Sequence, residues 1–533
     1  MSKTYSNLKF TSTFGADRDL NRHTMFYLKL LQVLTLLVRV SNAENCLPPT
    51  VQLALHNCTF SVANPNQTDV QSWGILLGVG KSEQLCVMVS TVVNSSMLQS
   101  SEVCSEDWLT VGNFTMTPAQ CRSRRGGYVM RSNLPKASID GLEDRNPGWK
   151  TFMAVDKVAP FQYAADAIIQ LRDESVTMVA GLITQGQQHT TSHIGLGEDS
   201  TLLQSLKDTG LIGSNSWGLN AGSQSYLAPR DGSLVLGGFD ESSIDGPFFN
   251  YSIAKPNMLN NRPCPLQIRI TGMKLRVSTG NGSTASSKSF YSNANPLQVC
   301  IEPYDNLFRL PEPDLQDILG IFSDVGANDT APVDEAQYLD LYNLEPGLVY
   351  PSSSGNFSVS LQITIDDGQT VTIPTSELVR PLRGLNTDGA QIVDTRFNEV
   401  QIYSQPAPED GPVFGKVFLS QLYLFVDYES SIFRLAKQNL EANTPLPKSL
   451  TRCPAEPKLT KTDKGLIAIG VVLAVLLLAA IGFGLYKFLT KPRSPNVAGN
   501  TAPVQDVPVE EGPYIPIHAR VGYQATVNHE VLP

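Results

Sequence analysis

The chain contains one short pattern twice, and this repeat limits the possible folds more than any other feature. In each copy an apolar run leads into a polar residue, and a glycine preceded by bulky apolar residues follows at a similar distance along the chain. The first copy comprises residues 85–89, Ser90 and Gly195, and the second comprises residues 299–301, Glu302 and Gly415. Two matching copies predict two lobes built on the same plan.

Residues 44–464 alternate short apolar runs with Gly, Pro, Asn and Ser, which is typical of a mainly β protein. Besides the repeat itself, we expect strands at 73–79, 176–183, 234–239, 266–270, 359–365 and 422–426. Two short segments have apolar residues at helical spacing, residues 201–207 and 313–322, and the second has a proline in its first turn.

Two longer apolar segments predict a membrane topology. Residues 25–43 place Lys29 before an apolar run and end in small residues, as a secretory signal peptide does, so the polar residues 1–24 are left out of the fold. Residues 465–486 are 22 consecutive residues without a charge, which is long enough to cross a bilayer as a helix. Lys487 and further basic residues follow directly. We therefore expect a single-pass type I protein of the plasma membrane or a secretory-pathway membrane.

The expected organisation has six parts. They are a leader and signal peptide (1–43), an N-terminal lobe (44–245), a C-terminal lobe (246–440), a juxtamembrane stalk (441–464), a transmembrane helix (465–486) and a disordered cytoplasmic tail (487–533). In the tail, Tyr514–Ile517 matches the loose pattern of endocytic sorting signals, but a pattern that fixes two positions also arises by chance.

Cysteines and glycosylation sequons agree with an extracellular or luminal body. All eight cysteines precede the apolar segment 465–486, which predicts disulfides. Cys104 and Cys121 enclose a short polar loop and are the pair that we expect first, while the other pairings stay open. Eight sequons also lie on this side of the segment, at Asn57, Asn66, Asn94, Asn113, Asn250, Asn281, Asn328 and Asn356.

Three segments, taken with the spacing of the repeat, resemble the pepsin family of bilobal aspartic proteases, and its membrane-anchored fungal members in particular. They are residues 232–240 (GSLVLGGFD), 302–311 (EPYDNLFRLP) and 413–427 (VFGKVFLSQLYLFVD), and the resemblance covers about residues 48–438. It implies a mainly β fold with two β-barrel-like lobes around a long peptide-binding cleft. In that cleft the framework positions would be Thr91, Gly195, Asp305 and Gly415.

The same resemblance predicts that the catalytic dyad is missing. In the family each lobe supplies an aspartate from an Asp-Thr-Gly turn, and the two carboxyl groups share one proton while they hold the attacking water. Here Ser90 and Glu302 occupy the two positions. A serine hydroxyl cannot act as a base near neutral pH, and the longer glutamate displaces its carboxylate. The turn residues differ as well, with Val92 and Tyr304 in place of glycines and Pro303 in place of a threonine.

Two other aspartates imitate the motif. Asp208-Thr209-Gly210 follows leucines at helical spacing, and Asp394-Thr395 is followed by an arginine where the family has glycine. We expect neither aspartate to be catalytic. Neither Tyr128 nor Tyr163 has the glycine that follows the family's flap tyrosine.

Other chemistry has little support in the sequence. His189 and His193 are spaced as H-x-x-x-H, but they lie in a Gln- and Thr-rich segment with no third ligand, so we expect a surface loop, no metal and no cofactor. The net charge of −10 is spread thinly without a basic run, which excludes nucleic acid as an expected partner.

The function expected from the sequence is recognition. We expect a membrane glycoprotein with a pepsin-like body that binds a peptide or a cell-wall glycan, or serves a structural role at the surface, without cleaving. The alternative is an active aspartic endopeptidase with a divergent active site, in which Glu302 works with an acid that the sequence does not identify.

Overall fold

The structure is a computed structural model. It describes residues 49–61, 69–80, 83–106, 109–111, 114–135, 163–171, 174–184, 191–255, 258–260, 262–279, 284–292, 294–304, 308–328, 347–354, 357–405, 411–442 and 445–450. All of these residues belong to one compact unit that ends at Cys453.

Strands dominate the N-terminal half. They are β1 (Val51–Phe60), β2 (Val70–Val79), β3 (Glu83–Ser90), β4 (Ser96–Gln99), β5 (Thr110–Val111), β6 (Phe114–Thr115), β7 (Tyr163–Leu171), β8 (Glu174–Ile183), β9 (His193–Gly195), β10 (Ser216–Asn220), β11 (Gly232–Leu236), β12 (Gly238–Asp240) and β13 (Ile244–Ser252). The α-helices described in this half are α2 (Pro118–Arg124) and α5 (Thr201–Asp208), and short 3₁₀ turns cover Ser101–Cys104, Arg131–Asn133 and Glu241–Ser243.

The C-terminal half has the same character. Its strands are β14 (Met258–Leu259), β15 (Arg262–Pro263), β16 (Gln267–Thr279), β17 (Thr284–Phe290), β18 (Leu297–Ile301), β19 (Phe308–Leu310), β20 (Val349–Pro351), β21 (Phe357–Ile365), β22 (Thr370–Ile373), β23 (Val379–Leu385), β24 (Gln391–Val400), β25 (Ile402–Ser404), β26 (Val413–Phe414), β27 (Leu422–Asp427), β28 (Ile432–Gln438) and β29 (Pro447–Ser449). Its described α-helices are α6 (Glu312–Asp324), α7 (Thr375–Leu378) and α8 (Lys416–Leu419), and a 3₁₀ turn covers Ser352–Ser354.

The prediction of a mainly β body is confirmed, and so are both predicted helices, which correspond to α5 and α6. One predicted strand differs. Residues 234–239 are divided between β11 and β12, because Gly237 between them has a φ of +80°, a conformation that interrupts a strand and that glycine adopts without strain.

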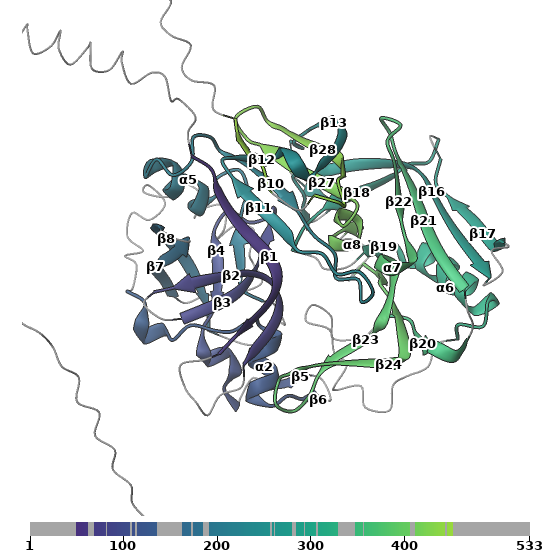
Figure 1. Cartoon of the computed structure of the whole chain (residues 1–533), viewed down its shortest axis with the longest axis horizontal. Coiled ribbons are helices and arrows are strands. Elements are labelled where there is room, and N and C mark those ends of the chain that lie inside the picture. Colours follow the sequence, from purple (N-terminus) through teal and green to yellow (C-terminus); the bar gives the residue numbers. More distant parts are fainter. Residues whose placement is uncertain are drawn as a thin grey trace, which may run out of the picture. The chain divides into compact units, whose positions relative to one another are not determined.

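Two large sheets organise the described residues. The first sheet has the strand order β13-β28-β27-β10-β11-β1-β2-β3-β9-β4-β8-β7, and the second has the order β22-β21-β16-β18-β26-β19-β25, with β17 paired to β16. Figure 1 shows the purple and blue strands of the first sheet on one side and the green strands of the second on the other. A third sheet, β20-β24-β23, we name the arm.

The sequence repeat corresponds to a repeat in three dimensions. In the first sheet β3 runs parallel to β9, β9 antiparallel to β4, and β4 parallel to β8. In the second sheet β18 runs parallel to β26, β26 antiparallel to β19, and β19 parallel to β25. The same three pairings in the same chain order support the prediction of two halves built on one plan.

The two halves are joined by strand pairing and by a shared hydrophobic core. Strands β27 and β28 come from the end of the described chain, yet β27 pairs with β10 in the first sheet, where Trp217 lies opposite Val426. One hydrophobic cluster contains buried residues of both sheets, including Trp217 and Leu234 of the first and Ile268 and Leu361 of the second. The two halves therefore share one core.

The predicted membrane segment lies outside the described residues, and so do the signal peptide and the tail. Within the part of the chain that the structure describes, no helix is both long enough and apolar enough to cross a membrane.

Candidate functional site

Ser90 and Glu302 occupy equivalent places in the two sheets. Ser90 is the last residue of β3 and lies opposite Gly195 in the parallel pair β3–β9. Glu302 directly follows β18, whose last residue, Ile301, lies opposite Phe414 in the parallel pair β18–β26, so that Gly415 is next to Glu302 in the register. In the described structure, the polar residue of each repeat therefore lies beside the distant glycine of the same repeat.

The glycine is required in the first of these pairs. A Cβ atom on Gly195 would lie 2.7 Å from the carbonyl carbon of Asn94 and 2.7 Å from the oxygen of Ser95, which is closer than any side chain tolerates. The turn after Ser90 therefore packs directly on the backbone of β9. This close approach explains why the sequence pattern carries a glycine at that distance from Ser90.

A direct hydrogen-bond link joins the two repeated turns. Thr91, next to Ser90, donates its backbone N–H to Glu302 Oε2 at 3.0 Å and to Oε1 at 3.3 Å. The Thr91 hydroxyl donates to Oε2 at 2.7 Å. Tyr304 N donates to Oε1 at 2.9 Å from the turn of Glu302 itself, and Ser90 directly precedes Thr91 in the first turn. We call this group, Ser90, Thr91, Glu302 and Tyr304, the turn clasp.

In the turn clasp, protein donors occupy the hydrogen-bond acceptor positions of the Glu302 carboxylate. Its two oxygens have about four lone-pair positions. Four hydrogen-bond contacts occupy them, from the N–H of Thr91 to each oxygen, from the hydroxyl of Thr91 to Oε2 and from the N–H of Tyr304 to Oε1. A water held for attack on a peptide bond would have to displace one of these protein donors.

Burial shifts the pKa of the Glu302 carboxyl group. The residue is 7% exposed, and this burial raises the pKa of the carboxyl group, while the hydrogen bonds from Thr91, Tyr304 and Ser90 lower it only in part. Among the described residues no second carboxylate contacts Glu302. The shared proton of a carboxylate pair, on which acid–base chemistry of the pepsin type depends, has no counterpart in the described site.

Tyr304 fills the space beside the clasp. Its ring packs edge-on against the imidazole of His193 with 5.0 Å between the ring centroids, and its hydroxyl lies 3.4 Å from the carbonyl oxygen of Thr191. Tyr304 thus bridges from the second repeat to β9 of the first, and the first sheet accommodates its ring.

The prediction for His193 is wrong. We expected a surface loop, but His193 begins β9, pairs with Met88 and Met97, and is buried. Burial lowers the pKa of the imidazole to about 4, although the Thr191 backbone raises it slightly, so the ring is neutral at physiological pH. The adjacent Ile194-Gly195 belongs to the repeat and could have predicted a buried strand at His193. The polar residues before His193 suggested a loop instead. His189 lies outside the described residues, and no metal-binding group of side chains occurs within them.

The two other Asp-Thr segments of the sequence, at Asp208 and Asp394, lie away from the turn clasp. Asp208 is the last residue of α5, where its carboxylate accepts from Gln204 Nε2 at 2.6 Å, and Gly210 after it has a φ of +74°, typical of a helix end. Asp394 lies in β24 of the arm, where Arg396 holds it with an Nη2–Oδ2 distance of 2.7 Å. The framework candidate Asp305 lies outside the described residues.

Two disulfides anchor the strands that lead to the clasp. Cys58–Cys86 ties β1 to β3, and Cys264–Cys300 ties the segment before β16 to β18. Cys86 precedes Ser90 on β3, and Cys300 lies on β18 just before Glu302, so each repeat has its own anchor. The expected pair Cys104–Cys121 is confirmed. Cys46 and Cys453 lie outside the described residues.

The described sequons differ in accessibility. Asn57, Asn250 and Asn328 are exposed. Asn94 is only 6% exposed, and its Oδ1 accepts from Asp199 N at 3.2 Å. This burial argues against the glycan expected at Asn94. The remaining sequons, Asn66, Asn113, Asn281 and Asn356, lie outside the described residues.

The Gly-Gly-Phe-Asp segment, residues 237–240, has a structural role. Asp240 is buried and accepts hydrogen bonds from the Ser242 hydroxyl at 2.7 Å, the Ser243 hydroxyl at 2.7 Å and Leu446 N at 2.7 Å. Its own N–H donates to the Tyr423 hydroxyl of β27 at 2.7 Å. This aspartate holds the first sheet to the end of the described chain and is separate from the clasp.

Comparison with models of known protein families gives no match, and comparison with curated proteins gives none either.

Proposed function

We propose that this chain is a catalytically silent counterpart of the pepsin-type aspartic proteases that binds peptides without cleaving them. In this proposal the two repeats keep the plan of the protease and the clasp replaces the dyad. The chain is presented as a single-pass type I glycoprotein of the plasma membrane or secretory pathway, as its apolar segments and sequons predict.

One observation carries the proposal. The two repeated turns meet at Ser90-Thr91 and Glu302, where the family places two aspartates, but the single carboxylate of the described site makes four hydrogen-bond contacts with Thr91 and Tyr304. Such a group is suited to holding two turns together. General acid–base catalysis needs the opposite, a carboxyl group that exchanges its proton with a positioned water.

The test is turnover by the full-length chain. Protein purified from a host that lacks aspartic proteases is incubated at acid pH with a broad peptide library and compared with the double variant Ser90→Ala/Glu302→Gln. We expect no cleavage above background from either protein, and unchanged peptides that raise the melting temperature of both. Cleavage by the unmodified chain that disappears in the double variant would establish an endopeptidase and overturn the proposal.

A protein that cleaves nothing and whose melting temperature no peptide changes would contradict the binding role as well. Polysaccharides are measured in parallel. If they raise the melting temperature and peptides do not, a glycan is the ligand and the peptide proposal is wrong.

A further inference from the structure

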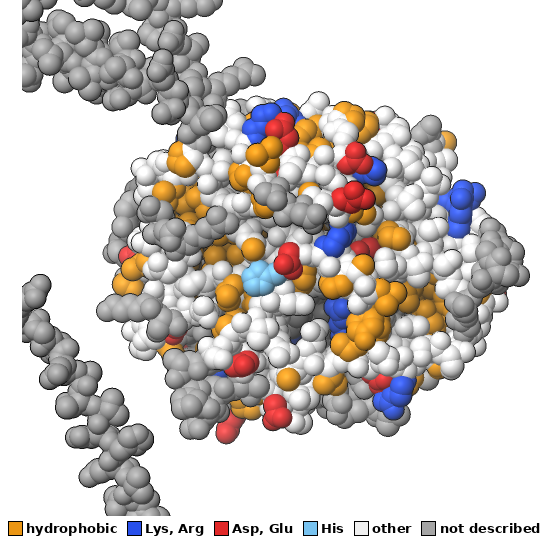
Figure 2. Space-filling model, viewed as in Figure 1, with side chains coloured by type: hydrophobic (Ala, Val, Ile, Leu, Met, Phe, Trp, Pro, Cys, Tyr) orange, Lys and Arg blue, Asp and Glu red, His pale blue; other side chains and the backbone are white. Residues whose placement is uncertain are grey.

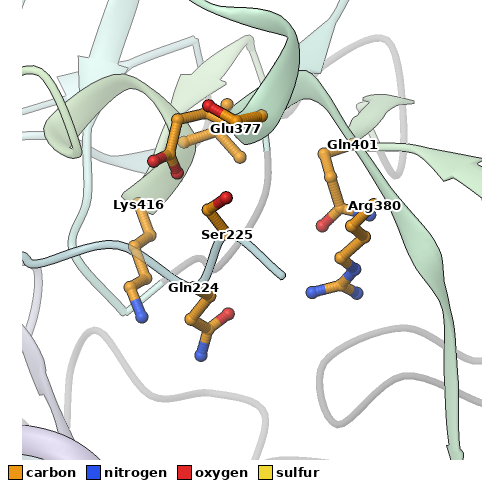
Figure 3. A pocket seen from close by; sticks show the side chains of 8 residues that line it. Gln224, Ser225, Glu377, Arg380, Gln401 and Lys416 are labelled. Carbon is orange, nitrogen blue, oxygen red and sulfur yellow. The ribbon is translucent and has the colours of Figure 1, made fainter. Parts of the chain in front are cut away.

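Distant parts of the described chain meet at a pocket between the loop that joins β10 to β11 and the elements α7, β23 and α8. Figure 2 shows blue Lys and Arg side chains bordering a hollow near the middle of the face drawn in Figure 1. Figure 3 shows the pocket from close by and labels Gln224, Ser225, Glu377, Arg380, Gln401 and Lys416. The charge of Lys416 stabilises the ionised form of Glu377, and Arg380 pairs with Glu399 at 3.2 Å. Because the free space is about that of one water molecule, the pocket suits no larger ligand.

The two ends of the described chain also meet, at Gly238 of β12. A Cβ atom on Gly238 would lie 2.1 Å from the oxygen of Lys448 in β29 and 3.1 Å from Cγ2 of Thr50, the residue before β1. Strand pairing agrees with this contact, because Ser449 of β29 lies opposite Gly238, and β1 pairs with β11, which ends two residues before Gly238. Figure 1 shows the start of β1, in purple, and β12 near the same edge of the body.

Several contacts fix the last described residues at this place. Leu446 N donates to Asp240 Oδ1 at 2.7 Å, and Leu446 O accepts from Glu241 N at 3.0 Å. Leu450 packs against the aromatic cluster that contains the buried Phe239. The chain therefore leaves β29 from a fixed position beside the start of β1.

Two cysteines lie just beyond these two ends. The three described disulfides use six of the eight cysteines, and the remaining two, Cys46 and Cys453, lie outside the described residues. Cys46 precedes Thr50 by four residues and Cys453 follows Ser449 by four residues, so each can lie up to about 13–14 Å from its end of the body. A disulfide needs Cα atoms about 4.4–6.8 Å apart, and both connecting segments are long enough to allow it.

Pairing within one chain is favoured over pairing between two copies. Short connecting segments hold the two thiols at an effective concentration on the order of mM. A second copy would have to reach that concentration to compete. The predicted signal peptide ends at Ala43, so Cys46 remains in the mature chain.

We propose that Cys46 and Cys453 form a disulfide that joins the two ends of the body. Both thiols lose their protons, and the two electrons pass to the disulfide of a thiol–disulfide oxidoreductase, which leaves as a dithiol. The bond links the segment before β1 to the predicted juxtamembrane stalk, so the start of the body is tied to the membrane anchor directly. The proposal goes beyond the binding function and rests only on passage of the body through the secretory pathway.

The test maps disulfides in the full-length chain, purified from a eukaryotic host and denatured in N-ethylmaleimide without reductant. Chymotrypsin separates Cys46 from Cys58, because it cleaves after Leu53 and Leu55. We expect mass spectrometry to find the peptides of Cys46 and Cys453 as one linked species without maleimide, and to find them separated after reduction.

Cysteine variants show which thiols are paired. Cys46→Ser should leave one maleimide, on Cys453, and Cys453→Ser should leave one on Cys46, whereas the double variant should leave none. The matched control is Cys104→Ser/Cys121→Ser, which removes a described disulfide and should leave the linked peptides unchanged.

A cut between β28 and β29 gives an independent measurement. A site for a sequence-specific protease is inserted between Asn443 and Thr444, so that the C-terminal fragment contains one cysteine, Cys453. After cleavage the two fragments should migrate together in SDS gel electrophoresis without reductant and separately with it. In the Cys453→Ser form they should separate under both conditions.

Three outcomes overturn the inference. They are maleimide on both Cys46 and Cys453 in the unmodified chain, a link from either cysteine to a different one, and disulfide-linked dimers that disappear in the Cys453→Ser variant. If the three described disulfides are present in the same digest, the inference fails while secretory passage stands. If all eight cysteines carry maleimide, both are wrong.

Discussion

At the scale of single residues, Glu302 links the two repeated turns. Its carboxylate accepts hydrogen bonds from the N–H and hydroxyl of Thr91 and from the N–H of Tyr304. A buried hydrogen bond to a charged group is among the stronger polar contacts in proteins, at about 1.5–3 kcal/mol. This clasp therefore contributes to stability, and pH should reveal its contribution.

The first prediction concerns the pH dependence of stability. Because burial raises the folded-state pKa of Glu302 above its usual value of 4.5, the proton-linked stability is fully present below that value and is lost as pH rises through the raised pKa. Glu302→Gln should remove this loss, so the difference in unfolding free energy between wild type and variant should shrink with increasing pH. Chemical denaturation of both proteins between pH 4 and pH 8 measures it.

Glu429→Gln is the control with the opposite sign. Burial tends to raise the pKa of Glu429, but the hydrogen bonds from Lys207 and Asn215 N outweigh it and lower the pKa. Its contribution is therefore present above the usual pKa and is lost as pH falls. If the Glu302 and Glu429 variants show the same trend with pH, the assignment of Glu302 is incorrect.

The second prediction concerns glycan occupancy. Expression in a eukaryotic host should give occupied sequons at Asn57, Asn250 and Asn328, because these side chains are exposed. Asn94 should be unmodified, because its buried Oδ1 accepts from Asp199 N. Mass spectrometry after enzymatic deglycosylation in ¹⁸O water reports each site. A glycan on Asn94 in folded protein would show that the turn after Ser90 is arranged differently.

At the scale of elements, the arm ties the two halves together. The tip of its hairpin β23–β24 reaches α2 of the N-terminal half, where Thr117 Oγ1 donates to Thr387 O at 2.6 Å and Gln120 Nε2 donates to Leu385 O at 3.1 Å. Figure 1 shows β23 and β24 extending toward α2. The two halves are therefore held together by the contact between the arm and α2 as well as by the turn clasp.

The third prediction tests that contact with a pair of glycines. Gly389 at the tip has a φ of +77°, and a Cβ there would lie 2.5 Å from Ala119 O of α2. Gly368 in the turn between β21 and β22 has a φ of +88° with nothing within 4 Å. Gly368→Ala should lower the unfolding free energy by about 1–2 kcal/mol, the usual cost of the left-handed conformation.

Gly389→Ala should lower the unfolding free energy by at least about 1 kcal/mol more, because the methyl group also forces the tip away from α2. Urea denaturation of both variants measures the difference. Equal losses would mean that the tip of the arm does not pack against α2 in solution.

At the scale of the whole molecule, the two halves are not independent. Strands β27 and β28 return to the first sheet, Tyr428 donates its hydroxyl to Leu196 O, and one hydrophobic cluster runs through both sheets. Unfolding of the described unit should therefore be cooperative, because separating the halves would expose the shared core.

The fourth prediction concerns attachment to the membrane. The uncharged run 465–486 predicts the anchor, so truncation after Thr460 should release a glycosylated body into the medium, while the full chain stays in the membrane fraction after a carbonate wash. Fractionation and immunoblotting of both forms provide the measurement. A truncated form that remains in the membrane fraction would contradict a single C-terminal anchor.

The sequence alone determined the repeated plan, the main strands, both helices and the pair Cys104–Cys121, because apolar periodicity, glycine spacing and loop length are local properties. Only the tertiary structure decided that His193 and Asn94 are buried, that Thr91 donates to Glu302, and that Lys416 meets Trp73 beside Gln401. Each of these features depends on residues that are distant in sequence and that strand pairing and side-chain packing bring together. Burial and hydrogen bonding at such positions depend on the partner strand, which no local pattern specifies.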